Sequence, residues 1–207
     1  ITYRSVPVQK KILGSIALDC LPNIYQIFIK PKNENIDESD FETSILQSRK
    51  FIEEIFLDDE KFYFCSLSSK TIIYKGLMLP KDIKNFYLDL KSKKFQTSIC
   101  VFHQRFSTNT SPKWHLAQPF RFLAHNGEIN AIRGNRNWVK ARSSKFKTPL
   151  IPKVQTFKQL VNESGSDSSS LDNMIELLLK GGVNLFRAVR MVIPPAWQNA
   201  QILDPDI

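Results

Sequence analysis

The sequence HQRFSTNTSPKWHLAQPFRFLAHNGEINAIRGNRNWVKAR, residues 103–142, is dense in arginine and asparagine and also holds two glycines and two tryptophans. A packed apolar core does not need so many polar residue types. The residues before 103 alternate between apolar runs and polar breaks, as expected of a scaffold. We therefore expect residues 103–142 to carry functional groups and the flanking sequence to form the elements that support them.

The composition is that of a soluble globular domain. The chain has 207 residues, of which 42% are hydrophobic and 24% are charged, and this length suits a single domain. No apolar run is long enough to cross a bilayer, so we expect no membrane insertion. Because the sequence starts at Ile1 without an initiator methionine and stops at Ile207 without a tail, we expect it to be a piece of a larger protein.

The sequence is basic, with a net charge of +9, and a basic chain raises the question of nucleic-acid binding. Its lysines are scattered, and neither a zinc-finger spacing nor an RNA-binding signature accompanies them. We interpret the charge as a solvated basic surface and expect no nucleic-acid partner. His103, His115 and His125 lack the spacing of metal ligands, so we expect no metal site.

The three cysteines are far apart, and each has apolar neighbours: Cys20, Cys65 and Cys100. This pattern predicts reduced, buried thiols in a reducing compartment. It provides no disulfide framework.

Strand and helix patterns alternate irregularly, which favours an α+β layered domain. Runs of β-favouring residues predict a strand within Ser15–Ile29, a hairpin of Phe62–Leu67 with Thr71–Lys75, and a strand at Thr97–Phe102. Helical spacing predicts a helix from Phe41 to near Asp58, one opened by Pro80, one after a capping box of Ser169 and Asp172 that stops at Gly181 and Gly182, and one over Val183–Met191.

Four residues could bind an amino acid. Arg105 follows a predicted strand and could clamp a carboxylate through two parallel hydrogen bonds, although a surface salt bridge is the default for a lone arginine. Asn126 and Gly127 could donate to an oxyanion, although spacing alone favours a plain Asn-Gly turn. Asp167 could bind an ammonium group, although the residues alone favour capping of the following helix.

Taken in order, the blocks HQRFSTNT, WHLAQPFR, AHNGEIN, GNRNW and SDSSSLDN resemble the glutamine amidotransferase domain of the glutamate synthase family. The upstream blocks YRSVPV and YKGLML agree, and the resemblance covers nearly all of the chain. It implies the four-layer αββα fold of the N-terminal nucleophile hydrolases, incomplete at its N-terminus. Residues 1–207 would then be part of a single class II glutamine amidotransferase domain.

The resemblance also implies a reaction. In that family an N-terminal cysteine attacks the side-chain amide of L-glutamine, giving a thioester and releasing ammonia. Asn126 and Gly127 would form the oxyanion hole. The nucleophile is not in this chain, because Cys20, Cys65 and Cys100 do not stand in the family's nucleophile context. We expect it upstream, with the synthase domains downstream.

The remaining site residues implied by the resemblance bind the substrate. Arg105 would hold the α-carboxylate of glutamine and Asp167 its α-ammonium group. Phe106 and Thr108 would line the same pocket.

For the intact protein the resemblance implies an oxidoreductase acting on CH–NH₂ groups, with ferredoxin as electron partner. Ammonia would aminate 2-oxoglutarate, and reduction would give a second glutamate. FMN and a 3Fe-4S cluster, with FAD as a further option, would belong to other domains, and we expect this segment to bind no cofactor. The Lys, Ile and Asn-rich composition suggests the plastid, that is the chloroplast stroma, with a bacterial cytoplasmic enzyme using NAD(P)H as the alternative.

Two other functions stay open: a class II amidotransferase of sugar-phosphate or asparagine type, and a non-catalytic basic binding module. The AQPFR and YKGLML blocks argue against the first, and the scattered lysines against the second. The chain departs from the family at His115, where proline is usual, at Ala131, where threonine is usual, and at Pro195, where glutamate is usual.

Overall fold

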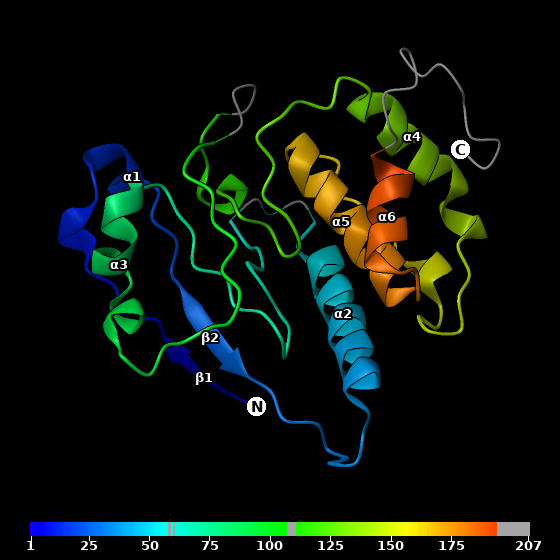
Figure 1. Cartoon of the computed structure of the whole chain (residues 1–207), viewed down its shortest axis with the longest axis horizontal. Coiled ribbons are helices and arrows are strands. Elements are labelled where there is room, and N and C mark those ends of the chain that lie inside the picture. The colour runs from blue at the N-terminus through cyan, green and yellow to red at the C-terminus, as the bar shows by residue number, and fades with distance from the viewer. Residues whose placement is uncertain (58, 60, 107–110, 194–207) are drawn as a thin grey trace.

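The computed structural model describes residues 1–57, 59, 61–106 and 111–193 of the chain. Two groups of elements lie side by side in Figure 1. The first comprises β1 (Thr2–Ser5), α1 (Ser15–Asp19), β2 (Tyr25–Phe28) and α3 (Ile83–Phe86). The second comprises α2 (Glu38–Ile55), α4 (Ile132–Arg142), α5 (Asp167–Lys180) and α6 (Leu185–Val192). The mixed helix and strand character predicted from the sequence is confirmed.

Strands β1 and β2 form an antiparallel pair, in which Thr2 lies opposite Phe28. The predicted strand within Ser15–Ile29 is therefore correct only for its last part, since Ser15–Asp19 is the short helix α1. The chain leaves that helix at Cys20 and turns back, which brings β2 alongside β1.

The other predicted strands are wrong for the described residues. Residues 62–67, 71–75 and 97–102 carry no strand assignment, and the ladder of β1 with β2 is accompanied only by an isolated bridge between Val8 and Tyr87. A β-favouring composition shows only that a segment suits a pleated, half-buried surface. A strand also needs a neighbouring strand to pair with, and these segments have none within the described part. The four-layer arrangement stays a prediction.

Helix α2 is the predicted helix of this region, and Asp37 caps it by accepting a hydrogen bond from the Ser39 N–H at 2.8 Å. Its buried face differs from the predicted apolar one. Arg49 is fully buried, whereas Ile55 is 62% exposed. Periodicity placed the hydrophobic residues on one side of the helix, but ion pairs with neighbouring elements turn a charged part of the surface inward.

The segment opened by Pro80 is helical as predicted, although it consists of short pieces: a 3₁₀ turn, helix α3 and a second 3₁₀ turn. Phe86 at the end of α3 is fully buried. It joins the core of the first group, which is built from Val6, Phe86, Tyr87 and Trp114.

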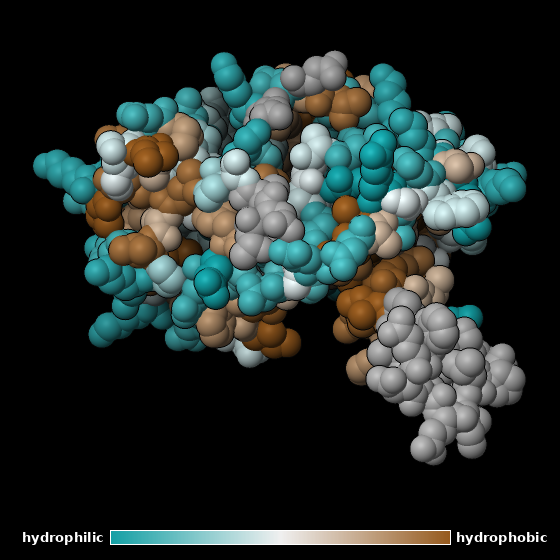
Figure 2. Space-filling view, turned by 90° about the horizontal axis from the view of Figure 1, so that it is seen from above, coloured by the Kyte–Doolittle hydropathy of each residue, from teal (hydrophilic) through white to brown (hydrophobic). Residues whose placement is uncertain are grey.

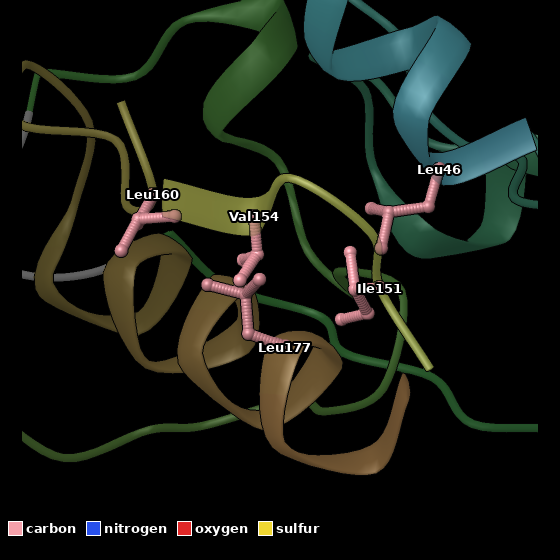
Figure 3. Packing of buried hydrophobic residues seen from close by; sticks show 5 residues of the cluster. All are labelled: Leu46, Ile151, Val154, Leu160 and Leu177. Carbon is pink, nitrogen blue, oxygen red and sulfur yellow. The ribbon is translucent and has the colours of Figure 1, made fainter. Parts of the chain in front are cut away.

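The second core lies between α2, α5 and the connection that follows α4, as Figure 3 shows. Its buried members are Leu46, Ile151, Val154, Leu160 and Leu177. The connection, residues 143–166, supplies Ile151, Val154 and Leu160, although its first part, residues 143–156, is basic and holds two prolines.

Helix α5 begins three residues earlier than the predicted capping box. Ser166, not Ser169, is the N-cap, and its side chain accepts a hydrogen bond from the Ser169 N–H at 3.1 Å. The run of serines offered several equivalent caps, and packing of the helix start selects among them. Gly181 ends the helix as predicted, and Gly182 adopts a left-handed φ of 91° that suits glycine.

The last predicted helix is confirmed as α6, which packs on α5 and is capped by the Asn184 side chain. Helix α4, in contrast, starts without a side-chain cap, because its N-cap position is Ala131. The departure at Ala131 therefore removes the hydroxyl that a threonine would offer there. Pro195 lies outside the described residues.

The prediction of buried thiols is wrong for two of the three cysteines. Cys20 and Cys100 are exposed and Cys65 is half-buried. Cys20 follows the short helix α1, and Cys100 lies in a segment without a strand partner, so their apolar neighbours do not mark a core. The face shown in Figure 2 carries apolar patches between hydrophilic side chains. Within the described ranges, no helix is long and apolar enough to cross a membrane.

Candidate active site

The loop of residues 125–129, which contains Asn126 and Gly127, is held at its start by Gln118. The Gln118 amide nitrogen donates to the His125 carbonyl at 2.9 Å, and its amide oxygen accepts from the His125 N–H at 2.8 Å. One buried side chain thus satisfies both backbone groups of His125. Asn126 and Gly127 themselves are exposed.

The end of the same loop is held by Asp167, the first residue of α5. Its Oδ2 accepts a hydrogen bond from the Ile129 N–H at 2.8 Å. Its Oδ1 accepts from the N–H of Ser168 at 2.6 Å and lies 3.2 Å from the Ser168 hydroxyl. The structure therefore brings Asp167 to the Asn126–Gly127 loop, as a common site requires.

The imidazole of His125 contacts the start of α5. Its Nδ1 lies 3.0 Å from the Ser168 hydroxyl. A Cβ atom on Gly127 would lie 2.9 Å from His125 Nε2, closer than such atoms approach in proteins. A side chain at position 127 would therefore require the His125 ring or the loop to shift.

Arg136 of α4 anchors the loop before α5. Its Nη2 donates to the carbonyls of Gly165 at 2.8 Å and Ser166 at 3.1 Å, and its Nε donates to the Ser170 hydroxyl at 2.9 Å. Burial lowers the pKa of Arg136, against the opposite effect of nearby Asp167. These bonds fix the N-terminal turn of α5 relative to α4.

The segment between Gln118 and His125 is anchored in turn by a buried charge network. The Phe122 N–H donates to Asp172 Oδ1 at 2.7 Å, and Asp172 is only 1% exposed. Arg121 Nε lies 3.3 Å from Glu176 Oε2 and 3.7 Å from Asp172 Oδ2. Glu176 also pairs with Arg49 of α2. Burial raises the pKa of Asp172, and Arg121 counteracts this.

Two lysines border a cavity of about 170 Å³ beneath this segment. Lys75 donates to the His115 carbonyl at 2.7 Å and lies 5.0 Å from the centre of the Phe120 ring. Burial lowers the pKa of Lys75 to about 8. Burial likewise lowers the pKa of Lys50 to about 8, although Glu53 acts in the opposite direction.

The other predicted substrate residues are not linked to this group by contacts between described residues. Arg105 is exposed, and its backbone N–H donates to His103 Nδ1 at 3.2 Å. Phe106 is half-buried. Thr108 lies outside the described residues. The roles assigned to these three side chains stay predictions.

Three residues that hold the loop and the helix start were not found by sequence reasoning: Gln118, Arg136 and Ser168. All three lie within the quoted blocks WHLAQPFR, GNRNW and SDSSSLDN. Their types gave no signal, because a glutamine, an arginine or a serine serves equally well on a solvated surface. Their partners are backbone groups or side chains distant in sequence, which a motif does not reveal.

A carboxylate at a helix N-terminus beside an Asn-Gly loop is an arrangement suited to an amino-acid amide. The chain belongs to the class II glutamine amidotransferases, whose family model matches residues 1–207. This match confirms the resemblance seen in the sequence.

Among its relatives are glutamate synthases. The chain is 42% identical over 203 residues to the ferredoxin-dependent glutamate synthase of Cyanidium caldarium. This match covers 96% of the chain and 13% of the relative. It is 40% identical over 202 residues to the chloroplastic ferredoxin-dependent glutamate synthase of Oryza sativa subsp. japonica, covering 95% of this chain and 12% of the relative. The chain is 38% identical over 202 residues to the glutamate synthase [NADPH] large chain of Azospirillum brasilense, and the match covers 96% of this chain and 13% of the relative. The chain thus spans 12 to 13% of the length of these relatives.

Proposed function

We propose that this chain is the glutamine-hydrolysing part of a glutamate synthase, acting in glutamate biosynthesis and ammonia assimilation. Its substrate is L-glutamine. The thiolate of a cysteine that is not among residues 1–207 attacks the side-chain carbonyl carbon. Collapse of the tetrahedral intermediate expels ammonia and leaves a thioester, which water hydrolyses to glutamate and the free thiol.

The observation that carries this proposal is the hydrogen bond from the Ile129 N–H to Asp167 Oδ2 at 2.8 Å. It joins a carboxylate suited to an α-ammonium group to a loop suited to an oxyanion. Asn126 would donate from its side-chain amide and Gly127 from its N–H. Glutamine presents an ammonium group and an amide carbonyl in one small molecule, so the pairing supports this substrate.

The carboxylate of Asp167 has capacity left for a ligand. It accepts three hydrogen bonds from Ile129 and Ser168. An ionised carboxylate offers about four lone-pair positions. Asp167 can therefore hold the loop and still accept from the ammonium group of the substrate.

Arg105 completes the proposed site as the clamp for the α-carboxylate, and Phe106 and Thr108 line the pocket. The exposure of Arg105 supports this role, since its guanidinium is accessible to a dissolved ligand. Its planar fork suits a carboxylate better than the point charge of a lysine does.

In the longer protein we propose that ammonia reaches 2-oxoglutarate and that ferredoxin supplies the electrons. The ferredoxin-dependent relatives support this donor, and their chloroplastic members support a plastid location. FMN and an iron–sulfur cluster are assigned to other domains. The described part of this chain holds no group of three or more His, Cys, Asp or Glu side chains that could bind a metal.

The test uses the full-length protein that contains this chain, supplied with glutamine labelled with ¹⁵N in the side-chain amide. Glutamate and labelled ammonia are expected as products. With 2-oxoglutarate and reduced ferredoxin present, the label should enter a second glutamate. Transfer of the label to a sugar phosphate or to aspartate would favour another class II enzyme, and absence of glutamine hydrolysis would refute the proposal.

A further inference from the structure

The loop of residues 125–129 has little packing of its own to fix it. Asn126, Gly127 and Glu128 are exposed. Polar contacts anchor the loop to other segments, among them the two bonds between Gln118 and His125, the bond from Ile129 to Asp167, and the contact of the His125 ring with Ser168. The Gln118 amide is hydrogen-bonded to the backbone of His125, directly before Asn126.

These two hydrogen bonds fix the orientation of the peptide plane between His125 and Asn126. The His125 carbonyl belongs to the same planar peptide group as the Asn126 N–H. When Gln118 Nε2 holds that carbonyl at 2.9 Å, it also sets the direction in which the backbone enters Asn126. The second bond, from the His125 N–H to Gln118 Oε1, prevents rotation of His125 about the first.

Gln118 is itself buried, as suits a positioning group. It is 7% exposed and follows the buried residues Leu116 and Ala117. Trp114, at the start of this short turn, is buried in the first core and donates from its indole nitrogen to the Ala17 carbonyl at 3.2 Å. Gln118 thus connects the start of the loop to the buried turn that follows Trp114.

We propose that Gln118 is a positioning residue that sets the Asn126–Gly127 loop for stabilisation of the oxyanion. This inference rests on the proposed glutamine hydrolysis. Oxyanion stabilisation depends on donors placed within about 0.5 Å of the productive position. The two hydrogen bonds between Gln118 and His125 matter most in the transition state, when charge develops on the carbonyl oxygen of the substrate. Their loss lowers kcat and leaves binding of the ground-state substrate nearly unchanged.

The test compares Gln118→Glu with the wild-type full-length protein in steady-state glutamine hydrolysis. The introduced side chain keeps the shape of glutamine and an acceptor for the His125 N–H, but its carboxylate cannot donate to the His125 carbonyl. We expect kcat to fall by roughly 10- to 100-fold, less than the roughly 100- to 1,000-fold that removal of an oxyanion donor costs. KM should stay within about twofold of the wild-type value, because the substrate clamps are untouched. Gln155→Glu, the same change at an exposed glutamine outside the loop, is the matched control.

Two further readouts separate positioning from a general structural role. Protonation of the carboxylate introduced by Gln118→Glu restores a donor, so the ratio of variant to wild-type kcat should rise as the pH is lowered. The aldehyde analogue of glutamine, which forms a tetrahedral adduct with the thiol, should lose affinity by the same factor as kcat. Free glutamate, which lacks the developing oxyanion, should bind as before.

The outcomes distinguish this inference from the proposed function. Wild-type protein without glutamine hydrolysis would refute the function, whereas active wild type with an equally active Gln118→Glu would refute the positioning role alone. A parallel loss of glutamate and aldehyde binding would also refute it. Gln118→Met, which removes both hydrogen bonds at similar side-chain volume, is a second test in case Gln118→Glu does not fold. If neither variant shows the circular dichroism of the wild type, Gln118 is structural and the inference fails.

Discussion

The backbone N–H of Ile129 donates to Asp167 Oδ2 at 2.8 Å, which joins two segments that are 38 residues apart in the sequence. Asp167, which would bind the α-ammonium group, thereby also holds the end of the loop of residues 125–129. In the proposed site, substrate binding and loop position would consequently depend on the same carboxylate.

Substitution of Asp167 should separate these two roles. Asp167→Asn keeps an oxygen acceptor for the Ile129 N–H but loses the charge that attracts an ammonium group. We expect KM for glutamine to rise by roughly 10- to 100-fold, since a hydrogen bond to a charged group contributes about 1.5–3 kcal/mol. Asp167→Ala should lower kcat as well, because the loop loses its anchor. Equal kcat values for the two variants in steady-state assays would contradict the shared role.

Gly127→Ala should impair catalysis through a steric effect. The new Cβ would lie 2.9 Å from His125 Nε2, and a shift of the ring would disturb the contact of its Nδ1 with the Ser168 hydroxyl. We expect the loop to shift and kcat to fall by about 10-fold or more.

Gly134→Ala on the exposed surface of α4 is the matched control, since nothing lies within 4 Å of the position that its methyl group would occupy. There the extra methyl group should raise the free energy of unfolding by about 0.5–1 kcal/mol, because alanine favours the helix. Wild-type kcat for Gly127→Ala would show that the loop tolerates a side chain.

Arg105→Ala should weaken glutamine binding by roughly 10- to 100-fold in KM, the value for a lost charge-assisted hydrogen bond. Arg105→Lys should recover only part of this, because an ammonium group cannot form the two parallel bonds of a guanidinium. Arg187→Ala on the exposed surface of α6 removes the same charge and serves as control. Unchanged glutamine affinity of Arg105→Ala in isothermal titration would show that the carboxylate clamp lies elsewhere.

The sequence allowed α2, α5, α6 and the segment opened by Pro80 to be predicted, because these depend on local patterns, whereas α1 was predicted as part of a strand and α4 was not predicted. The loop residues were identified through the family resemblance, since spacing alone favoured a plain turn. Helix α2 follows from its periodicity, and the end of α5 follows from Gly181 and Gly182. The predicted strands failed where the ladder partner is missing, since pairing is a property of two segments. The role of Gln118 could not be predicted either, because its partner is the backbone of His125, and every residue except proline offers the same backbone groups.

Glu176→Gln should destabilise the fold strongly. Glu176 is buried, pairs with Arg49 and lies 3.3 Å from Arg121 Nε, so its neutralisation leaves buried positive charge poorly compensated. Loss of one partner from such a network costs about 3–5 kcal/mol. Glu34→Gln breaks the exposed pair with Lys30 and should cost less than about 1 kcal/mol. Urea unfolding of residues 1–207 measures both, and similar values for the two variants would show that the buried network contributes no more than a surface pair.

Lys75 should make the stability depend on pH. Burial lowers its pKa from the ordinary 10.5 to about 8. Between these two pH values the unfolded chain holds the proton that the folded chain has released, so this group makes the free energy of unfolding rise with pH. Lys75→Met removes the effect. The stability of the variant relative to wild type should therefore be highest below pH 8 and should decline towards pH 10.5. Urea unfolding across this range measures the difference, and a difference independent of pH would show that Lys75 is not desolvated in the folded protein.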